Sequence, residues 1–423
     1  MPAGARQLKL PAALLGLRGL NNLGQTCFMN CILQIFLHCP PVVRFFLSDR
    51  HNRLACVNRR KNEQQTGERG GADPRPCLAC EMDTIFAACY SGVQTPYSPH
   101  TFLHAMWCSS EHFAGYDQQD AHEFLVAMLA AIYKSFREPE IAPVTTTSTP
   151  SVLESLCVRA PTAGGQPARK AYQDLSAIFA GVLRSEVTCV NCGHISVKME
   201  DFADISLDLT RQYKFGAGGV AEVVRSSELS PGPGNASSGG AAESLTACLR
   251  AFTGIEHLRC SERCWCDQCG SLQDSSKQMS IERLPNVLCL QLKRFRQRME
   301  RGNQASKVDS FVEFPLHSLN MYKYTSAYIS SHKRRKDSAG ATNGASASER
   351  TSSEPCPAAA EHLYDLFGIA LHHGTMQNGH YTAYVRRYAS WFHCDDASIT
   401  PATPTAVRSC KAYLLFYIRK AIC

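Results

Sequence analysis

The chain has 423 residues, of which 44% are hydrophobic and 19% are charged, and this is a globular composition with enough apolar material for a large core. Its formal net charge of +7 is too small to indicate a nucleic-acid-binding protein by itself. No apolar run reaches the roughly 20 residues that a membrane span requires, and the first 20 residues lack a convincing signal peptide. We therefore expect the 21 cysteines to be thiols, metal ligands or catalysts rather than disulfides.

Helical periodicity dominates the first part of the chain. Phe28, Ile32 and Phe36 recur at helix spacing before the Pro40–Pro41 pair, which we expect to end the helix. A second amphipathic helix is predicted to begin near Asp120. Later segments alternate in polarity or are rich in branched and aromatic residues, and they predict strands at VLCLQLKRF, LYDLFGIAL, HYTAYV and AYLLFYI.

Three polar segments of biased composition interrupt this pattern, at residues 139–167, 215–242 and 325–360. Such segments bury too little apolar surface to offset the entropy of ordering, so we expect them to be mobile insertions. Helices first and strands later predict one α+β domain of two lobes with a cleft between them. We expect residues 1–19 to be an N-terminal extension and residues 20–420 to form this domain.

A candidate nucleophile lies in the segment NNLGQTCFMNC. Cys27 follows a glycine-containing turn and begins the first predicted helix, and a helix N-terminus lowers the pKa of a thiol toward the reactive thiolate. The side chain of Asn22 and the backbone N–H of Cys27 are candidate donors to the oxyanion of a tetrahedral intermediate. A buried cysteine without chemistry is the alternative, because free cysteines are often core residues.

A candidate base and a candidate acid lie much later in the chain. His380, in NGHYTAYV, stands at the head of a predicted strand, from which an imidazole can project into a cleft. Asp395 and Asp396, in WFHCDDASI, follow one strand later. In such a set the base activates the thiol, and a carboxylate fixes the tautomer of the imidazole. The residues alone leave both acids as candidates.

Paired cysteines at metal-ligand spacing predict two structural zinc sites. The CxxC pairs of VTCVNCGH and CWCDQCGS predict a four-cysteine site made of Cys189, Cys192, Cys266 and Cys269. Cys260 and Cys264 crowd the second pair, so two of these ligands stay open. A site of three cysteines and one histidine is predicted around RPCLACEM from His51, Cys56, Cys77 and Cys80. Unpaired loop cysteines are the alternative there.

Together these segments resemble the ubiquitin-specific proteases. GLNNLGQTCFMN is similar to their cysteine box, GYDQQDAHEFL to an internal Gln/Asp box, and NGHYTAYV with WFHCDDASI to their histidine box. The resemblance covers nearly all of residues 20–417, with the boxes in the family's order. It implies a papain-like fold with a thumb, a palm and zinc-bearing fingers.

The resemblance also implies a role for each candidate. It makes Cys27 the nucleophile, His380 the base and Asp395 the third catalytic residue, with Asp396 as the rival of Asp395. Asn22 takes the oxyanion role by its position. The implied reaction is hydrolysis of the isopeptide bond between the terminal glycine of ubiquitin and a substrate lysine.

Asp120 and Glu123 resemble acidic residues with which the family grips the basic tail of ubiquitin. They are three residues apart and therefore share one face of the predicted helix. An acidic helix start that is favoured by the helix dipole is the alternative for this pair.

LSDRH, CLACEM and WFHCDDA narrow the resemblance to the deubiquitinases of the SAGA transcriptional coactivator. This implies a nuclear enzyme that acts on ubiquitinated proteins such as histone H2B, together with adaptor subunits. The cytoplasm is the alternative location. We expect the chain to lack the N-terminal zinc-finger ubiquitin-binding domain that such relatives usually carry.

Three other functions compete with this interpretation. The chain is alternatively a catalytically silent ubiquitin-binding scaffold, a general papain-like peptidase, or a zinc-knuckle protein that binds nucleic acid. The last is disfavoured because the CxxC pairs lack interleaved basic and aromatic residues. The basic run Lys333–Lys336 suggests a nuclear signal or a contact with nucleic acid in the context of the nucleosome alone, and a solvated charge cluster is the alternative. We expect no membrane partner.

Overall fold

The computed structural model describes residues 16–51, 53–54, 56, 59, 76–136, 174–209, 212–215, 221–224, 243–296, 306–339, 361–375 and 378–422. The chain forms two compact units. The first comprises Met1–Ile178 and Phe367–Phe416, and the second comprises Phe179–Leu366 and Tyr417–Cys423. Each unit combines helices with strands, as the predicted α+β class requires.

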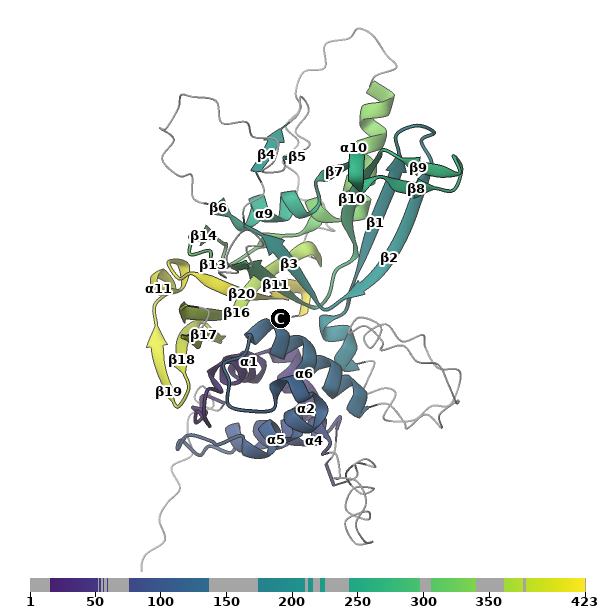
Figure 1. Ribbon diagram of the computed structural model, residues 1–423. Helices are drawn as coiled ribbons and strands as arrows, with labels where there is room; N and C mark the ends of the chain where they lie inside the picture. Colours follow the sequence, from purple (N-terminus) through teal and green to yellow (C-terminus); the bar gives the residue numbers. More distant parts are fainter. Residues whose placement is uncertain are drawn as a thin grey trace, which may run out of the picture. The chain divides into compact units, whose positions relative to one another are not determined.

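The helices of the first unit form one group (Figure 1). They are α1 (Cys27–Leu37), α2 (Pro40–Leu47), α4 (Leu78–Cys89), α5 (His100–Ser109) and α6 (Ala121–Ser135), with the short η2 (Glu111–Phe113) between the last two. Every residue of α1 is buried, and the helix packs against α6. The proline pair was predicted to end a helix, but it also begins α2, because proline is well tolerated in a first helical turn.

A twisted sheet supports α1 in the same unit. Its strands run in the order β19 (Ser398–Ala402), β18 (Ser390–Asp395), β17 (Gly379–Arg387), β16 (Leu363–Gly374) and β20 (Ala412–Arg419). The pairs from β16 to β19 are antiparallel. The helix approaches β16 closely, because a Cβ atom at Gly368 would lie only 2.8 Å from Cγ2 of Ile35. The short α11 (Pro404–Arg408) precedes β20.

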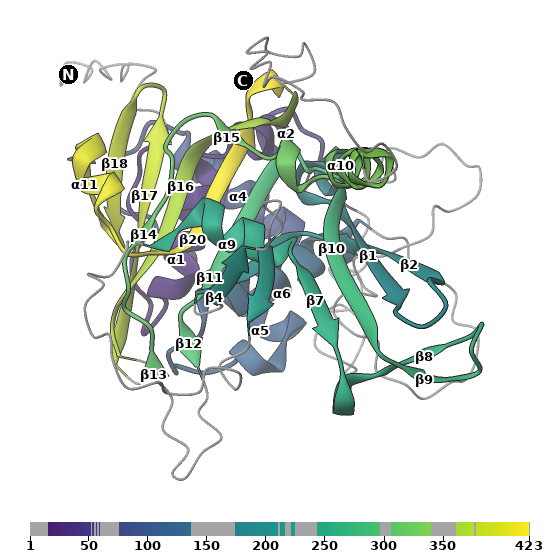
Figure 2. The ribbon, with the colours of Figure 1, turned by 90° about the horizontal axis from the view of Figure 1, so that it is seen from above.

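The second unit is built on a six-stranded sheet. Its order is β2 (Ile195–Phe202), β1 (Gly181–Cys189), β10 (Ser275–Arg283), β7 (Ile255–Leu258), β5 (Ala221–Val224) and β4 (Gln212–Phe215). A parallel pair is formed by β3 (Asp204–Asp208) and β11 (Val287–Lys293). A separate two-stranded hairpin is formed by β8 (Cys264–Cys266) and β9 (Ser271–Gln273). α9 (Leu245–Phe252) packs against β3 and β5, while α10 (Ser326–Ala339) lies along β10 (Figure 2).

The remaining elements are short. They are β6 (Glu243–Ser244), η4 (Cys260–Glu262), β12 (Phe295–Arg296), β13 (Ser306–Lys307), β14 (Val312–Glu313), β15 (Leu319–Asn320), η5 (Tyr322–Tyr324) and η7 (Lys420–Ile422). The four strands predicted from alternation correspond to β11, β16, β17 and β20.

The three predicted insertions have different outcomes. Residues 139–167 lie outside the described residues. Within 215–242, the described part contains β5 and the end of β4. The prediction for 325–360 is wrong in its first part, because α10 occupies it and is anchored by a 2.6 Å hydrogen bond from Ser326 Oγ to Glu282 Oε2. The Nζ atom of Lys333, which begins the basic run, pairs with Glu186 at 3.1 Å.

No single helix in the described part of the chain is long and apolar enough to cross a membrane. The helices α1 and α2 pass such a test only together, and they are bent by 82° at the break between them.

The C-terminal end of α1 carries a buried histidine that titrates in an unusual range. His38 is 3% exposed, and its Nδ1 atom lies 2.8 Å from the carbonyl oxygen of Gln34. Burial lowers the pKa of His38 from 6.5 to about 4, and the nearby positive charge of Arg387 adds to this effect against the opposing Gln34 carbonyl.

We predict that His38 makes the protein less stable as the pH falls from 6.5 toward 4. In this window the unfolded chain takes up a proton that the folded chain excludes, so the free energy of unfolding decreases by up to about 1.4 kcal/mol per pH unit. Urea unfolding of the wild type and His38→Asn between pH 4.5 and 7.5 measures the difference, because the asparagine keeps a donor but does not titrate. The exposed His100→Asn is the control, and parallel curves for wild type and His38→Asn would contradict the prediction.

Candidate active site and metal centres

Cys27 is the first residue of α1 and is 3% exposed. The loop before it is fastened by Asn22, whose Oδ1 accepts the backbone N–H of Gly24 at 3.0 Å and that of Thr26 at 3.1 Å. Within this loop Gln25 has a left-handed φ of 56°, which is uncommon for a residue with a side chain. The sequence prediction that Cys27 begins the helix is therefore confirmed, and its loop is held in one conformation by hydrogen bonds.

The electrostatic environment of Cys27 differs from the sequence prediction. Burial raises the pKa of its thiol above the usual value, and the carboxylate of Asp396 raises this pKa further. The backbone N–H groups of Tyr381, Phe28 and Cys27 itself lower the pKa, as expected at a helix start, but burial outweighs them. The expectation of a lowered pKa is wrong for this state, in which the sulfur needs a base to become a thiolate.

The candidate base is carried by β17, the strand whose backbone also reaches the thiol. His380 is the second residue of that strand, and the next residue, Tyr381, directs its backbone N–H at the sulfur of Cys27. The Nε2 atom of His380 is 2.7 Å from Oδ1 of Asp395, the last residue of β18. Because an ionised carboxylate only accepts, Nε2 carries the proton and Nδ1 is left as the basic nitrogen. This tautomer allows Nδ1 to take a proton from the thiol.

Asp396, the rival of Asp395, faces a different set of groups. Its Oδ2 atom accepts a hydrogen bond from Asn22 Nδ2 at 2.9 Å, and its Oδ1 atom accepts one from Asn30 Nδ2 at 2.8 Å. Its backbone has a left-handed φ of 46°, and its carbonyl oxygen accepts the N–H of Leu20 at 2.9 Å. The two adjacent acids therefore have different partners, because Asp395 pairs with His380 and Asp396 accepts from the amide of Asn22.

Asn30 is a residue of the site that sequence reasoning missed. It is 2% exposed on α1, and its Nδ2 atom also lies 3.3–3.4 Å from the carbonyl oxygens of Leu20 and Asn21. A polar amide in an otherwise apolar buried helix must find partners inside the protein, and this was the available signal. An amide nitrogen carries two hydrogens, so Asn22 can donate to Asp396 and to an oxyanion at once.

Asp120 and Glu123 have separate roles at the start of α6. Oδ1 of Asp120 caps the helix by accepting the N–H groups of His122 at 2.7 Å and Glu123 at 3.1 Å, and the hydroxyl of Tyr413 donates to the same carboxylate. This is the structural alternative that the sequence left open for Asp120. Glu123 is exposed and lies 3.4 Å from Nε2 of His112, so its carboxylate is placed to meet a cationic partner.

A cluster of four potential metal ligands is buried in the first unit. All its ligand atoms lie within 4.8 Å of one another, and its members are the predicted His51, Cys56, Cys77 and Cys80. The Nε2 atom of His51 is 3.2 Å from Cys80 Sγ and 3.7 Å from Cys77 Sγ. Cys77 precedes α4 directly, so the helix positions two of the four ligands at CxxC spacing.

A second cluster in the second unit joins the hairpin of β1 and β2 to that of β8 and β9. Its members are the predicted Cys189, Cys192, Cys266 and Cys269. The sulfur of Cys192 is 3.5 Å from that of Cys266, and the sulfur of Cys189 is 3.9 Å from that of Cys269. A tetrahedral metal with bonds of about 2.3 Å to sulfur requires sulfur separations near 3.8 Å, so this donor set fits one. Cys260 and Cys264 are not members of the cluster.

Comparison with known families matches residues 18–417 to the family described as ubiquitin carboxyl-terminal hydrolase. The chain belongs to this family. The predicted resemblance to the ubiquitin-specific proteases and the predicted α+β fold are thereby confirmed. The matched residues include Cys27, His380 and Asp395 of the candidate triad and both clusters of potential metal ligands.

Individual relatives of the chain belong to the same family. The chain is 36% identical to ubiquitin C-terminal hydrolase 22 of Arabidopsis thaliana, over 96% of this chain and 65% of the relative. It is 35% identical to ubiquitin carboxyl-terminal hydrolase 51 of Mus musculus, over 100% of this chain and 54% of the relative. The chain thus spans between half and two thirds of the length of these proteins.

Solved structures give the same result. A chain of the Ubp8/Sgf11/Sus1/Sgf73 SAGA DUB module bound to monoubiquitin matches with a TM-score of 0.62 and 27% identity, covering 96% of the present chain and 70% of that chain. A chain of the same module bound to ubiquitin aldehyde matches with a TM-score of 0.60 and 26% identity, with the same coverage. The predicted likeness to the SAGA deubiquitinases is confirmed at the level of sequence and fold.

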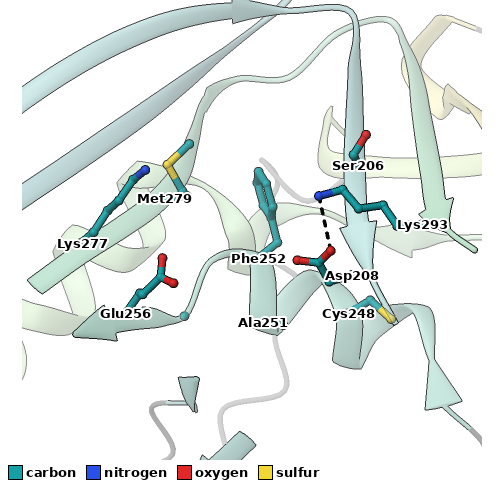
Figure 3. Close-up of a pocket in the computed structure, with 10 residues that line it drawn as sticks. Ser206, Asp208, Cys248, Ala251, Phe252, Glu256, Lys277, Met279 and Lys293 are labelled. Carbon is teal, nitrogen blue, oxygen red and sulfur yellow. Dashed lines mark ion pairs between the residues drawn. The ribbon is translucent and has the colours of Figure 1, made fainter. Parts of the chain in front are cut away.

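A cavity of about 260 Å³ lies in the second unit between α9 and strands β3, β7, β10 and β11 (Figure 3). Phe252 and Met279 form its apolar part, and Lys277 and Lys293 extend into it from opposite walls. Lys293 pairs with Asp208 at 3.3 Å. None of the residues predicted for catalysis or metal binding lines this cavity.

We predict that the negative charge of Asp396 shifts the alkylation of the Cys27 thiol to higher pH. Asp396→Asn removes a negative charge that raises the pKa of the Cys27 thiol, so alkylation of Cys27 by iodoacetamide should begin at lower pH than in the wild type. Peptide mass spectrometry measures the modification of this one cysteine across pH 6–10. The adjacent Asp395→Asn is the matched control, because its carboxylate is turned to His380. An equal shift in both variants, or none in Asp396→Asn, would show that the charge of Asp396 does not act on the thiol.

Proposed function

We propose that this chain is a thiol-dependent deubiquitinase, which hydrolyses the isopeptide bond between the terminal glycine of ubiquitin and a lysine of a conjugated protein. The observation that carries the proposal is the pairing of His380 Nε2 with Asp395 Oδ1 at 2.7 Å beside the helix-starting Cys27. The family match along residues 18–417 supplies the substrate class.

The proposed reaction begins with transfer of the Cys27 proton to Nδ1 of His380. The thiolate attacks the carbonyl carbon of the terminal glycine, and the resulting oxyanion is held by the amide of Asn22 and the backbone N–H of Cys27. His380 then gives its proton to the departing lysine amine, and a thioester remains on Cys27. A water molecule that gives its proton to His380 hydrolyses the thioester and releases ubiquitin with a free carboxylate. Asp395 stabilises the imidazolium in both half-reactions.

We assign the recognition of the basic ubiquitin tail mainly to Glu123. Its carboxylate is exposed, and within the described part of the chain it pairs with the imidazole of His112, which a guanidinium group can displace. The carboxylate of Asp120 already accepts hydrogen bonds from two backbone N–H groups and from Tyr413. Asp120 therefore contributes by fixing the start of α6 beneath Glu123, and its negative charge adds to the local field.

We propose zinc as the metal of both four-ligand clusters. Cysteine and histidine donors in tetrahedral sets are the ligands that zinc prefers. Each cluster offers four protein ligands, which leaves no open position for substrate, so both sites are structural. The first would fix the segment between α2 and α4, and the second would fix the ends of two hairpins.

We predict that each cluster holds one equivalent of zinc. Cys80→Ala should lose the zinc of the first cluster and Cys269→Ala that of the second, each with a lower melting temperature, because metal binding and folding are coupled. Elemental analysis of the purified proteins and thermal unfolding measure both effects. Cys260→Ala is the control, since this cysteine lies outside the cluster, and it should retain both metals. Two equivalents of zinc in Cys269→Ala would contradict the assignment.

The biological setting is proposed from the relatives. The matched chains belong to SAGA modules that contain Sgf11, Sus1 and Sgf73, and one such module is bound to monoubiquitin. We propose that this chain acts in the nucleus on chromatin substrates such as histone H2B, with comparable adaptor subunits. The raised pKa of the buried Cys27 thiol favours a chain that is weakly active until ubiquitin or an adaptor rearranges the site.

We predict that the purified wild type hydrolyses ubiquitin–aminomethylcoumarin and that Cys27→Ala does not. Alanine has no nucleophilic side chain, so the rate of hydrolysis should fall to the detection limit of the fluorescence assay. Labelling by ubiquitin propargylamide at Cys27, located by mass spectrometry, is the second measurement, and Cys31→Ala is the control with the nucleophile intact. A folded, metal-loaded wild type that neither turns over nor is labelled would establish the alternative, a silent ubiquitin-binding scaffold.

A further inference from the structure

One side chain joins the two segments that carry the nucleophile and the base. Gln118 lies in the loop before α6, two residues ahead of the helix-capping Asp120. Its Oε1 atom accepts the backbone N–H of Gly379 at 2.8 Å, and its Nε2 atom donates to Oε1 of Gln25 at 3.0 Å. Gly379 directly precedes His380, and Gln25 lies two residues before Cys27.

The direction of these two hydrogen bonds follows from the donors themselves. A backbone N–H can only donate, so the oxygen of the Gln118 amide must face Gly379. Its nitrogen then faces Gln25, which must present its own oxygen to accept. Both polar ends of the Gln118 amide are therefore used, and turning this amide over alone would lose both hydrogen bonds.

Both segments need an external anchor. The backbone of Gln25 is in the left-handed region, with φ of 56°, which is held only when the surroundings favour it. At the other segment, a Cβ atom on Gly379 would lie 2.0 Å from Nε2 of His372, so no side chain fits there. The strand that carries His380 must therefore be held at this point by its main chain, and Gln118 binds that main-chain N–H.

We propose that Gln118 is a positioning residue, which sets the separation between the loop of Cys27 and the head of the strand that carries His380. This inference rests on the proposed thiol-dependent hydrolysis. A displacement of about 1 Å between reacting groups costs on the order of 100-fold in rate, so a planar amide that fixes this separation acts on catalysis without touching substrate. Gln119 has a different geometry, because the hydrogen bond of its Nε2 atom goes to the carbonyl oxygen of His112, at 3.4 Å.

Three variants test the proposal. Gln118→Met removes both hydrogen bonds at similar side-chain length, Gln118→Glu keeps an oxygen for the Gly379 N–H, and Gln119→Met is the matched control. With ubiquitin–aminomethylcoumarin, Gln118→Met should lower kcat about 10- to 100-fold with KM changed less than about 3-fold, as expected for misplaced reacting groups. Gln118→Glu should retain more of kcat than Gln118→Met, and Gln119→Met should resemble the wild type.

A second readout does not depend on ubiquitin. The rate of Cys27 alkylation by iodoacetamide as a function of pH reports whether His380 acts on the thiol. The profile of Gln118→Met should move toward that of His380→Ala, while the melting temperature stays near that of the wild type. This comparison still tests the positioning role of Gln118 if the wild type fails to hydrolyse the ubiquitin substrate. Such a failure would count against the proposed function alone.

Two results would overturn the positioning role. One is a Gln118→Met protein with the kcat and the alkylation profile of the wild type. The other is a loss of kcat that is matched by a lowered melting temperature and equal in Gln118→Met and Gln118→Glu, which would mark Gln118 as a purely structural residue.

Discussion

The complete burial of α1 is the constraint on which the rest of the site depends. Every residue from Cys27 to Leu37 is buried, so the packing of the helix against α6 and β17 fixes the position of Cys27. Burial also forces the polar residues of this helix to find internal partners. Asn30 finds the carboxylate of Asp396, and Gln34 finds the carbonyl oxygen of Arg18 at 2.8 Å. Through Asn30, the buried helix is thus hydrogen-bonded to Asp396 of the candidate site.

The same burial works against the chemistry. A thiolate is disfavoured in a buried place, and the adjacent carboxylate of Asp396 disfavours it further, so the pKa of the Cys27 thiol is raised although it begins a helix. Backbone N–H groups offset only part of this effect. The burial that fixes the position of the sulfur therefore also disfavours its thiolate. The His380–Asp395 pair can offset this effect by taking the proton of the thiol. The proposed need for ubiquitin or an adaptor follows from this conflict.

The metal clusters fix parts of the chain that the apolar core does not reach. The buried set around His51 lies next to a strongly polar stretch of sequence, and the four-cysteine set joins two hairpins, one of which carries the exposed Trp265 on β8. With the proposed zinc bound, four strong, short-range ligand bonds would add to the packing in both places. The nucleophile, by contrast, is held by packing and by hydrogen bonds from distant segments.

The sequence by itself determined the features that depend on local spacing. The helix that starts at Cys27, the alternating strands, the CxxC pairs and the family's boxes follow from residues close together in the chain, because periodicity and CxxC spacing are local properties. The folded chain then groups the pairs into two clusters, and Cys260 and Cys264 are outside them. α10 was missed because its polar composition carries no apolar period, and contacts with β10 hold it instead. Only the tertiary structure decided which of two adjacent acids faces His380, in which direction the pKa of Cys27 moves, and that Gln118 bonds to Gly379 across 261 residues. These outcomes depend on burial and on pairings between distant segments, which exist only once the chain has folded.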